Sequence, residues 1–251
     1  AKQRYDVVFG AYSFQSFTHF KAPYPLLTAY TADATFSVYK RSDVGQSFGS
    51  SWVSRKLLDP MTERAERRIY GNLDLALWPS EWLKREADAL YGLTDTQSLV
   101  VPWGANISPP AEPKPLPLSA DKPVELLVVG RDWFAKGGPL ALEVVAGLKS
   151  RGLPARLTIV GCEPDGVQHS DCITIIPQLD KSKPKDMATF ESLFRHAHFL
   201  INPSFESFGF AYCEASAYGL PSLAFRVGGV PVRDRINGHA LPLGSSAEDF
   251  V

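Results

Sequence analysis

The sequence contains few cysteines and no long apolar run. Its three cysteines, Cys162, Cys172 and Cys213, are an odd number without C-x-x-C spacing. They therefore indicate neither a disulfide framework nor a zinc site, and they favour a reducing, cytoplasmic setting. No apolar stretch reaches the roughly 18 residues that a membrane helix needs, and no signal peptide is recognisable. We predict a cytoplasmic protein, and peripheral association with the inner face of a membrane stays open.

An excess of charge of either sign is also missing. The chain has 26 basic and 27 acidic residues among 251, with 45% apolar residues, which is typical of a globular protein. This balance gives no reason to expect nucleic acid as a partner. The five histidines lack metal-ligand spacing, so we expect no metal site and no cofactor.

Two glycine-rich nucleotide motifs are absent. Gly130 opens a loop that lacks the second glycine and the Ser/Thr of a P-loop, and no predicted strand ends in G-x-G-x-x-G. These absences exclude a Walker A nucleotide site and weaken a dehydrogenase hypothesis.

Proline, by contrast, is concentrated in one segment. Residues 108–123, SPPAEPKPLPLSADKP, hold six prolines in sixteen positions, a density that favours an extended chain without helix or central strand. We interpret this segment as a linker between a domain at 1–107 and a domain at 124–251. The alternative is a proline-rich surface loop inside one domain.

The second domain alternates short apolar runs with helical patterns. Non-alternating apolar strands separated by helices are typical of a parallel sheet covered on both faces, so we predict a doubly wound α/β domain. The predicted strands are 124–130, 155–161, 173–177, 199–203 and 221–225, and the predicted helices are 139–152, 185–197 and one that starts near Gly209.

The first domain carries the same signals more thinly. Asp59 and Ser80 are expected to be the N-caps of two helices, the first running to about Tyr70 and the second to Gly92. Residues 40–58 are expected to form a long loop with some helix. The predicted strands are 6–10, 25–30, 73–79 and 98–103.

The loop after the strand at 124–130 carries two cations. Arg131 and Lys136 lie directly before a helix that starts near Pro139. Ligands bind at the carboxyl ends of parallel strands, and a helix N-terminus with two cations suits a diphosphate. The alternative is that both are solvated loop charges. This segment alone supports the two interpretations equally.

The loop after the strand at 199–203 carries two glutamates with seven residues between them. Glu206 stands before the helix that starts near Gly209, and Glu214 lies inside that nearly apolar helix, where we expect partial burial. A buried carboxylate needs donors, which a ribose diol would supply. The alternative for Glu206 is a first-turn acid that favours the helix dipole. The alternative for Glu214 is a hydrogen bond or salt bridge to a neighbouring loop, with Arg226 as one candidate partner.

These segments resemble glycosyltransferase family 4, the group 1 retaining glycosyltransferases. The resemblance rests on VGRDWFAKGG, FESFGFAYCEASAYGLP and RVGGVPV…NGHALPL, and it covers residues 124–251, while 1–107 resembles the family more loosely. It implies a GT-B fold of two Rossmann-like domains with the active site between them. Only about five residues precede the strand at 6–10, so the N-terminal domain is expected to be incomplete and the chain truncated.

The resemblance also implies roles for individual residues. Arg131 and Lys136, with Gly137 beside them, would bind the donor diphosphate and stabilise the leaving group. Glu214 would hold the ribose hydroxyls, and Glu206 would contact the transferred sugar near its anomeric carbon.

The remaining expectations from the resemblance concern the backbone and the acceptor. Amides around Phe208 and Gly209 would bind sugar hydroxyls and the distal phosphate, without an obligatory metal. Asp33 and Thr35 are weak candidates for the acceptor side.

The function predicted from the sequence is sugar transfer from a nucleotide-diphosphate sugar to an unidentified acceptor, with retention. The acceptor would be a carbohydrate, a lipid-linked molecule or another small molecule. The alternative is a module that binds nucleotide sugars without transferring them. A different Rossmann-type enzyme, such as a dehydrogenase, and a GT-B phosphorylase with a pyridoxal cofactor lack their signatures.

Overall fold

The chain separates into two compact units. The computed structural model describes residues 4–21, 24–47, 54–119 and 121–251. Unit 1 comprises Ala1–Trp103 with Glu206–Phe208, and unit 2 comprises Gly104–Phe205 with Gly209–Val251. Each unit is built around its own parallel sheet. Within the described ranges, no helix is long and apolar enough to cross a membrane.

Unit 1 contains a sheet of four parallel strands in the order β1-β2-β3-β4. The strands are β1 (Val7–Ala11), β2 (Leu27–Thr31), β3 (Leu75–Trp78) and β4 (Ser98–Val100). The helices are a 3₁₀ turn η1 (Phe14–Phe17), α1 (Phe36–Arg41), α2 (Asp43–Ser47), a π-helical turn η2 (Ser54–Leu58), α3 (Asp59–Gly71) and α4 (Glu81–Tyr91).

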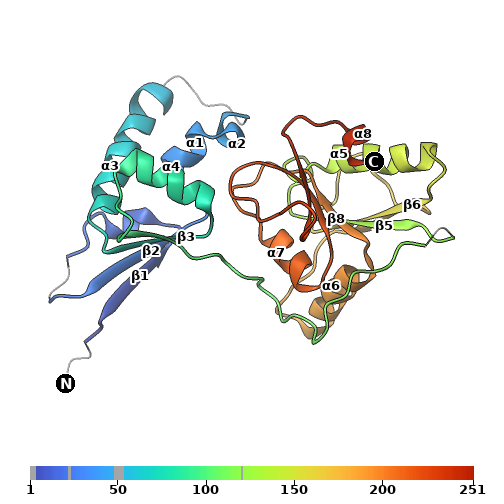
Figure 1. Cartoon of the computed structure of the whole chain (residues 1–251), viewed down its shortest axis with the longest axis horizontal. Helices are drawn as coiled ribbons and strands as arrows, with labels where there is room; N and C mark the ends of the chain where they lie inside the picture. Colours follow the sequence, from blue (N-terminus) through green and yellow to red (C-terminus); the bar gives the residue numbers. More distant parts are fainter. Residues whose placement is uncertain (1–3, 22–23, 48–53, 120) are drawn as a thin grey trace. The chain divides into compact units, whose positions relative to one another are not determined.

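The core of unit 1 lies between one face of this sheet and its helices. Figure 1 shows α1, α3 and α4 on the same side of the strands. Tyr30 and Trp78 extend from that face and meet Tyr70 of α3, with ring centroids 5.3 and 5.9 Å from the Tyr70 ring. The Trp78 indole donates to the Ser98 hydroxyl at 2.9 Å, so its one polar group is satisfied inside the core.

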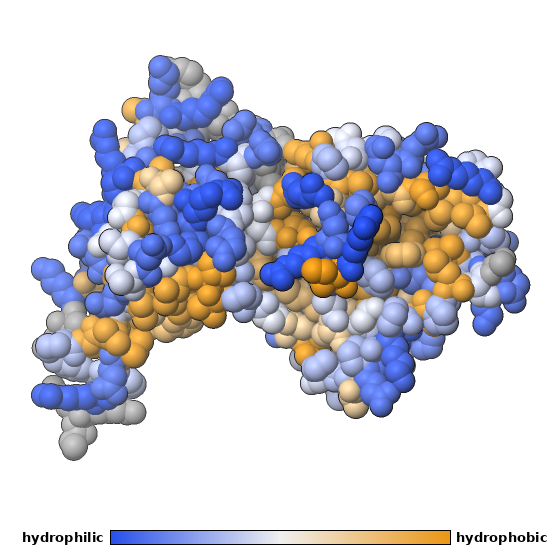
Figure 2. Space-filling view, viewed as in Figure 1, coloured by the Kyte–Doolittle hydropathy of each residue, from blue (hydrophilic) through white to orange (hydrophobic). Residues whose placement is uncertain are grey.

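The other face of this sheet exposes apolar side chains. Val7, Phe9, Leu27 and Leu99 are between 40% and 58% exposed, and Figure 2 shows apolar residues gathered over the strands of this unit, at the lower left. Parallel sheets are normally covered on both faces. In the described part of unit 1, helices therefore cover one face of the sheet and leave the other face exposed.

Unit 2 contains a six-stranded parallel sheet in the order β10-β9-β8-β5-β6-β7. Its strands are β5 (Val124–Val129), β6 (Ala155–Val160), β7 (Ile173–Ile176), β8 (Phe199–Asn202), β9 (Ser222–Phe225) and β10 (Gly238–Leu241). Its helices are α5 (Gly138–Ser150), α6 (Pro184–His196), α7 (Phe210–Ala217) and α8 (Ala247–Phe250).

Helices cover both faces of this second sheet. Along β5, Leu126 and Val128 pack into a cluster with α5, whereas Leu127 packs into a second cluster with Phe190 and Phe194 of α6. Figure 1 shows α5 and α8 on one side of the strands and α6 and α7 on the other. The prediction of a doubly wound sheet is confirmed for this unit.

The predicted helix ends are partly confirmed. Ser80 is the N-cap of α4 and accepts from the Leu83 amide at 3.2 Å, and Gly92 ends that helix with φ of +73°. The prediction that Asp59 caps α3 is wrong, because Leu58 is the N-cap. The turn η2 runs directly into α3, so Asp59 is already helical and its carboxylate accepts from the Ser54 hydroxyl at 2.9 Å instead.

Three elements were not expected. The helix α1 starts at Phe36, before the predicted loop, while β10 and α8 follow the last predicted strand. Residues 48–53 of the predicted loop lie outside the described residues. The proline-rich segment contains no helix or strand in its described part. It groups with unit 2, where the Tyr218 hydroxyl donates to the Ser108 carbonyl at 3.3 Å.

Candidate functional site

All strands of unit 2 run parallel, so their carboxyl ends meet at one edge of the sheet. The loops that follow β5, β6, β7 and β8 begin there, and the helices α5 and α7 start near it. This is the edge at which open α/β sheets bind ligands. The predicted cations and the predicted glutamates follow β5 and β8, which are neighbours in the sheet.

The loop after β5 is tied down by Asp132. Its carboxylate accepts from the Ala135 amide at 2.9 Å, and its carbonyl accepts from the Lys136 amide at 3.0 Å. The Lys136 side chain then runs back across Gly130, where an added Cβ would lie 2.3 Å from the lysine Cγ. Glycine at position 130 therefore makes room for Lys136 at the end of the strand.

Lys136 is partly buried and its ammonium is poorly solvated. Burial lowers the pKa of Lys136 below its ordinary value, and the negative charge of Asp132 acts in the opposite direction. Arg131, in contrast, is exposed at the start of the loop.

Gly137 brings this loop against the end of β8. Its φ is +72°, and an added Cβ would lie 2.1 Å from the carbonyl oxygen of Pro203. The Phe205 amide donates to the Ala135 carbonyl at 3.3 Å across the same junction. Gly137 is also the N-cap of α5, and Pro139 lies in that helix's first turn. The loops after β5 and β8 are thus packed together beside the N-terminus of α5.

Asn202 joins the last residues of β8 to β5. It is fully buried, its amide donates to the Val129 carbonyl at 2.9 Å, and its side-chain oxygen accepts from the Val129 amide at 3.2 Å. The Tyr212 hydroxyl of α7 donates to the Asn202 carbonyl at 2.6 Å. Gly209 is the N-cap of α7 with φ of +93°, a conformation that favours glycine. The start of α7 is therefore fixed to the sheet edge.

Glu214 is buried in α7, with 3% of its surface exposed. The prediction of burial is confirmed, and so is the alternative of a salt bridge to a neighbouring loop, but Arg226 is not the partner. Arg226 donates to Asp234 at 2.8 Å and to the Ala240 carbonyl at 2.8 Å. Glu214 instead forms an ion pair with Lys181, whose Nζ lies 2.5 Å from Oε1.

Sequence comparison identifies the family to which this arrangement belongs. The family description "Glycosyl transferases group 1" matches residues 123–251, which is more than half of the chain. The chain belongs to the group 1 glycosyltransferases. The match covers the sheet edge and both of its loops.

Two curated relatives share this similarity. D-inositol 3-phosphate glycosyltransferase of Mycobacterium tuberculosis (strain ATCC 25177 / H37Ra) is 28% identical over 195 residues, 71% of this chain and 40% of that protein. The enzyme of the same name from Corynebacterium glutamicum (strain R) is 31% identical over 114 residues, 41% of this chain and 27% of that protein. The chain thus spans less than half the length of these relatives.

Solved structures share the fold. Sucrose-phosphate synthase from Thermosynechococcus elongatus aligns with a TM-score of 0.63 at 21% identity, over 98% of this chain and 62% of that one. The lipopolysaccharide outer core galactosyltransferase WaaB gives a TM-score of 0.65 at 18% identity, over 98% and 64%. Anabaena Alr3699/HepE in complex with UDP and glucose gives 0.60 at 14%, over 98% and 66%. The group 1 chain therefore has the Rossmann-like GT-B fold.

The predicted residues Glu206 and Phe208 lie in the loop between β8 and α7. They group with unit 1, whereas Gly209 and Glu214 belong to unit 2. In the sequence, seven residues separate Glu206 from Glu214, and Glu206 lies in the segment that leads into α7. Their roles toward a sugar stay predictions.

Two further candidates have structural explanations. Thr35 is the N-cap of α1, where it accepts from the Val38 amide at 3.2 Å and hydrogen-bonds to Tyr91 at 2.6 Å. His198 is buried and accepts from the Glu125 amide at 2.9 Å. In the described part of the group 1 chain, no cluster of three metal-ligating side chains occurs.

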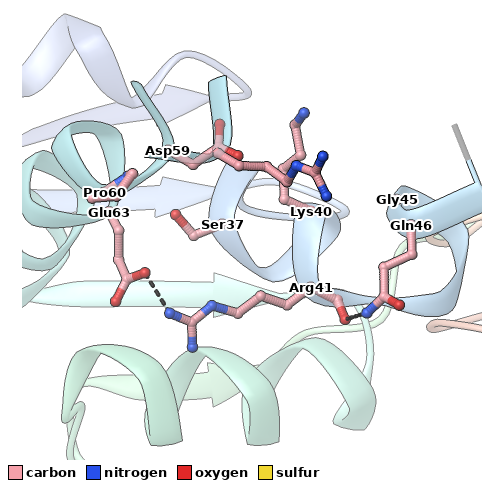
Figure 3. Close-up of a pocket in the computed structure, with 9 residues that line it drawn as sticks. Ser37, Lys40, Arg41, Gly45, Gln46, Asp59, Pro60 and Glu63 are labelled. Atoms are coloured by element: carbon pink, nitrogen blue, oxygen red, sulfur yellow. Dashed lines mark hydrogen bonds and ion pairs between the residues drawn. The ribbon is translucent and has the colours of Figure 1, made fainter. Parts of the chain in front are cut away.

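A cavity of about 540 Å³ lies in unit 1. In Figure 3, Arg41 and Glu63 point toward one another across it, with Nη2 2.5 Å from Oε2. The Gln46 amide donates to the Arg41 carbonyl at 2.9 Å. The cavity carries both signs of charge, so its chemistry does not favour an anion. The lining residues are Ser37, Lys40, Arg41, Gly45, Gln46, Arg55, Asp59, Pro60 and Glu63.

Proposed function

We propose that this chain forms the donor-binding part of a family 4 retaining glycosyltransferase. The donor is a nucleotide-diphosphate sugar, and its sugar passes to an acceptor hydroxyl with retention of anomeric configuration. The observation that carries the proposal is that half-buried Lys136 and buried Glu214 lie in the segments that follow β5 and β8, two neighbouring strands that end at the same sheet edge. Family membership and the GT-B fold support it.

The diphosphate would bind at the loop after β5. Lys136 and Arg131 supply positive charge there, beside the N-terminus of α5. During transfer, the bond between the anomeric carbon and the diphosphate oxygen breaks, and negative charge gathers on the diphosphate. The two cations would stabilise that leaving group, which lowers the barrier to reaction.

The nucleoside and the sugar would bind at the segment after β8. Glu214 accepts hydrogen bonds from the ribose hydroxyls, because a buried carboxylate needs donors that it does not have to share with water. Glu206 contacts hydroxyls of the transferred sugar near its anomeric carbon. Backbone amides around Phe208 and Gly209 bind sugar hydroxyls and the distal phosphate.

A thermal-shift panel with UDP, GDP and ADP, and with their sugars, tests the donor site. A ligand present at about 100-fold its Kd raises the free energy of unfolding by roughly 2.7 kcal/mol. We expect at least one nucleotide to raise the Tm, and Lys136→Ala or Glu214→Ala to reduce that shift. If no nucleotide shifts the Tm, the donor-site assignment is wrong.

A module that binds nucleotide sugars without transferring them is the second candidate. It is favoured by the location of Lys136 and Glu214 in unit 2 alone. Incubation of a full-length form with the donor separates the two functions. An enzyme releases or transfers the sugar and loses this activity in Glu206→Gln, whereas a binding module shows neither reaction.

The choice of acceptor has one experimental starting point. The curated relatives are named for D-inositol 3-phosphate, so that compound belongs in the acceptor panel beside simple sugars and lipid-linked sugars. Product formation with one class and not with the others would assign the acceptor.

A further inference from the structure

The partner of Glu214 comes from a different strand end. Lys181 lies in the loop after β7, and Glu214 lies in the helix after β8. In the sheet these two strands are separated by β5 and β6, so the contact joins segments that follow two non-adjacent strands. Its 2.5 Å distance between Nζ and Oε1 is that of a charge-assisted hydrogen bond.

The conformation of the loop that carries Lys181 is fixed by hydrogen bonds. The Asp180 carboxylate accepts from the amide and the hydroxyl of Ser182, at 3.0 and 2.7 Å, which forms a tight turn at Lys181. The Asp180 amide in turn donates to Asp186 in the first turn of α6 at 3.0 Å. On the other side, Leu179 packs against the core. Lys181 is therefore held at its base from both directions.

The ammonium group is held at its tip as well. The Lys181 Nζ lies 4.0 Å from the centroid of the Phe190 ring, a cation–π distance, and Phe190 is buried in the core. The lysine side chain is nevertheless 36% exposed. Lys181 thus combines a fixed position with access from the ligand side of the sheet.

We propose that Lys181 is a positioning residue of the nucleotide site. It fixes the Glu214 carboxylate through Oε1 and holds it in an orientation in which it accepts from a ribose hydroxyl. This inference rests on the proposed function of the donor edge. It adds Lys181 to the donor-site residues named above. The selection of the ribose then depends on a side chain from the loop after β7.

The chemistry assigns Lys181 one further property. An ammonium has three N–H groups, of which one is directed to Glu214. Because the side chain is accessible, another N–H can donate to an oxygen of the bound nucleoside. The site therefore favours ribonucleoside diphosphates over their 2′,3′-dideoxy counterparts.

The test is a comparison of ligands across matched variants. Dissociation constants are measured for UDP, GDP and ADP and for the 2′,3′-dideoxy form of each, with wild type, Lys181→Met and Lys181→Arg. Methionine keeps an apolar chain over Phe190 without the charge, and arginine restores the charge. Lys183→Met is the control, because Lys183 is an exposed lysine of the same loop that pairs with Asp180 at 3.6 Å.

We expect Lys181→Met to bind the ribonucleotide about tenfold more weakly and to lose most of the preference over the dideoxy form. Lys181→Arg should retain most of that preference, and Lys183→Met should retain all of it. A merely structural role would weaken both ligands equally and leave their ratio unchanged, which overturns the inference. If wild type binds no nucleotide, the proposed function itself fails; if Glu214→Gln loses the preference while Lys181→Met keeps it, only the role of Lys181 fails.

Discussion

Each unit of this protein buries one glutamate, and the two are satisfied in different ways. Glu66 of α3 has no exposed surface, and its carboxylate accepts from the amides of Phe36 and Ser37, at 2.8 and 3.1 Å, and from the Tyr91 hydroxyl at 2.9 Å. Every one of these donors is part of the fold of unit 1. Glu66 therefore holds the start of α1 against α3 and α4.

Glu214 of unit 2 is almost as buried, but its hydrogen-bond donor is of a different kind. Among the described residues, the hydrogen bond that the structure gives to its carboxylate comes from the accessible ammonium of Lys181. The comparison distinguishes a structural carboxylate, whose donors are all internal, from a carboxylate that retains accepting capacity at a ligand edge. Burial alone does not distinguish these two kinds of carboxylate. They differ in whether their hydrogen-bond donors are internal to the fold or accessible at the ligand edge.

The largest expected effect is the loss of stability in Glu66→Ala. The substitution leaves two backbone amides and a tyrosine hydroxyl buried without their acceptor, at about 1–3 kcal/mol for each such group. We expect urea unfolding to show a loss of about 3 kcal/mol or more. Glu63→Ala, one turn earlier in α3, removes partly exposed ion pairs with Arg41 and Arg67 and should cost less than about 1 kcal/mol. Equal losses in the two variants would remove the structural role of Glu66.

The second effect concerns Glu214→Gln and is seen in binding rather than in stability. Hydrogen bonds to charged groups contribute about 1.5–3 kcal/mol, so nucleotide affinity should fall roughly 10- to 100-fold. The free energy of unfolding should change by less than about 1 kcal/mol, because the accessible Lys181 can be solvated when its partner is neutral. A stability loss as large as that of Glu66→Ala would make Glu214 a second structural glutamate.

A smaller effect is expected from Gly130→Ala. The new Cβ would meet the Lys136 side chain and displace its ammonium from the strand end. We expect about a tenfold loss of nucleotide affinity, which corresponds to about 1.4 kcal/mol, by isothermal titration calorimetry. Gly71→Ala is the matched control, since an added Cβ there meets no atom within 4 Å. Unchanged affinity in Gly130→Ala would remove Lys136 from the diphosphate site.

The smallest effect is a pH dependence of stability that comes from Glu66. Burial raises the pKa of its carboxyl above the ordinary value of 4.5, and the hydrogen bonds from Ser37, Tyr91 and Phe36 act in the opposite direction. Between 4.5 and the raised pKa the folded state binds more protons than the unfolded state, so stability falls as the pH rises through that window. Relative to Glu66→Gln, wild type should lose stability as the pH rises through that window.

Urea unfolding of both proteins from pH 4.5 to pH 7 checks this direction. Stability of wild type that rises with pH relative to Glu66→Gln would mean that the hydrogen bonds outweigh the burial of the charge.

Much of the fold of unit 2 was predictable because its buried strands are continuous apolar runs. Leu126 to Val128 alternate between two cores, one on each face, and both cores require apolar residues. The placement of Lys136 at a strand end followed from the same pattern. Among the strands of unit 2, β10 was not predicted, because it is a short strand that begins at Gly238 within a segment of turns.

The two features that decide the chemistry were not predictable in this way. Lys181 and Glu214 are 33 residues apart, and no periodicity connects a loop lysine to a helix carboxylate. In α3, Glu63 and Glu66 look alike in the sequence, and only the packing of α1 and α4 shows that Glu66 is buried. Long-range polar contacts of this kind follow from tertiary structure and not from local patterns.

The most direct test of the central claim combines a change in the protein with a change in the ligand. Kd values are measured for wild type and Glu214→Gln, each with the best-binding nucleoside diphosphate and with its 2′,3′-dideoxy form. If Glu214 binds the ribose hydroxyls, wild type discriminates between the two ligands and Glu214→Gln does not, so the two changes are not additive. Equal discrimination by both proteins would show that the ribose is bound elsewhere and would contradict the account.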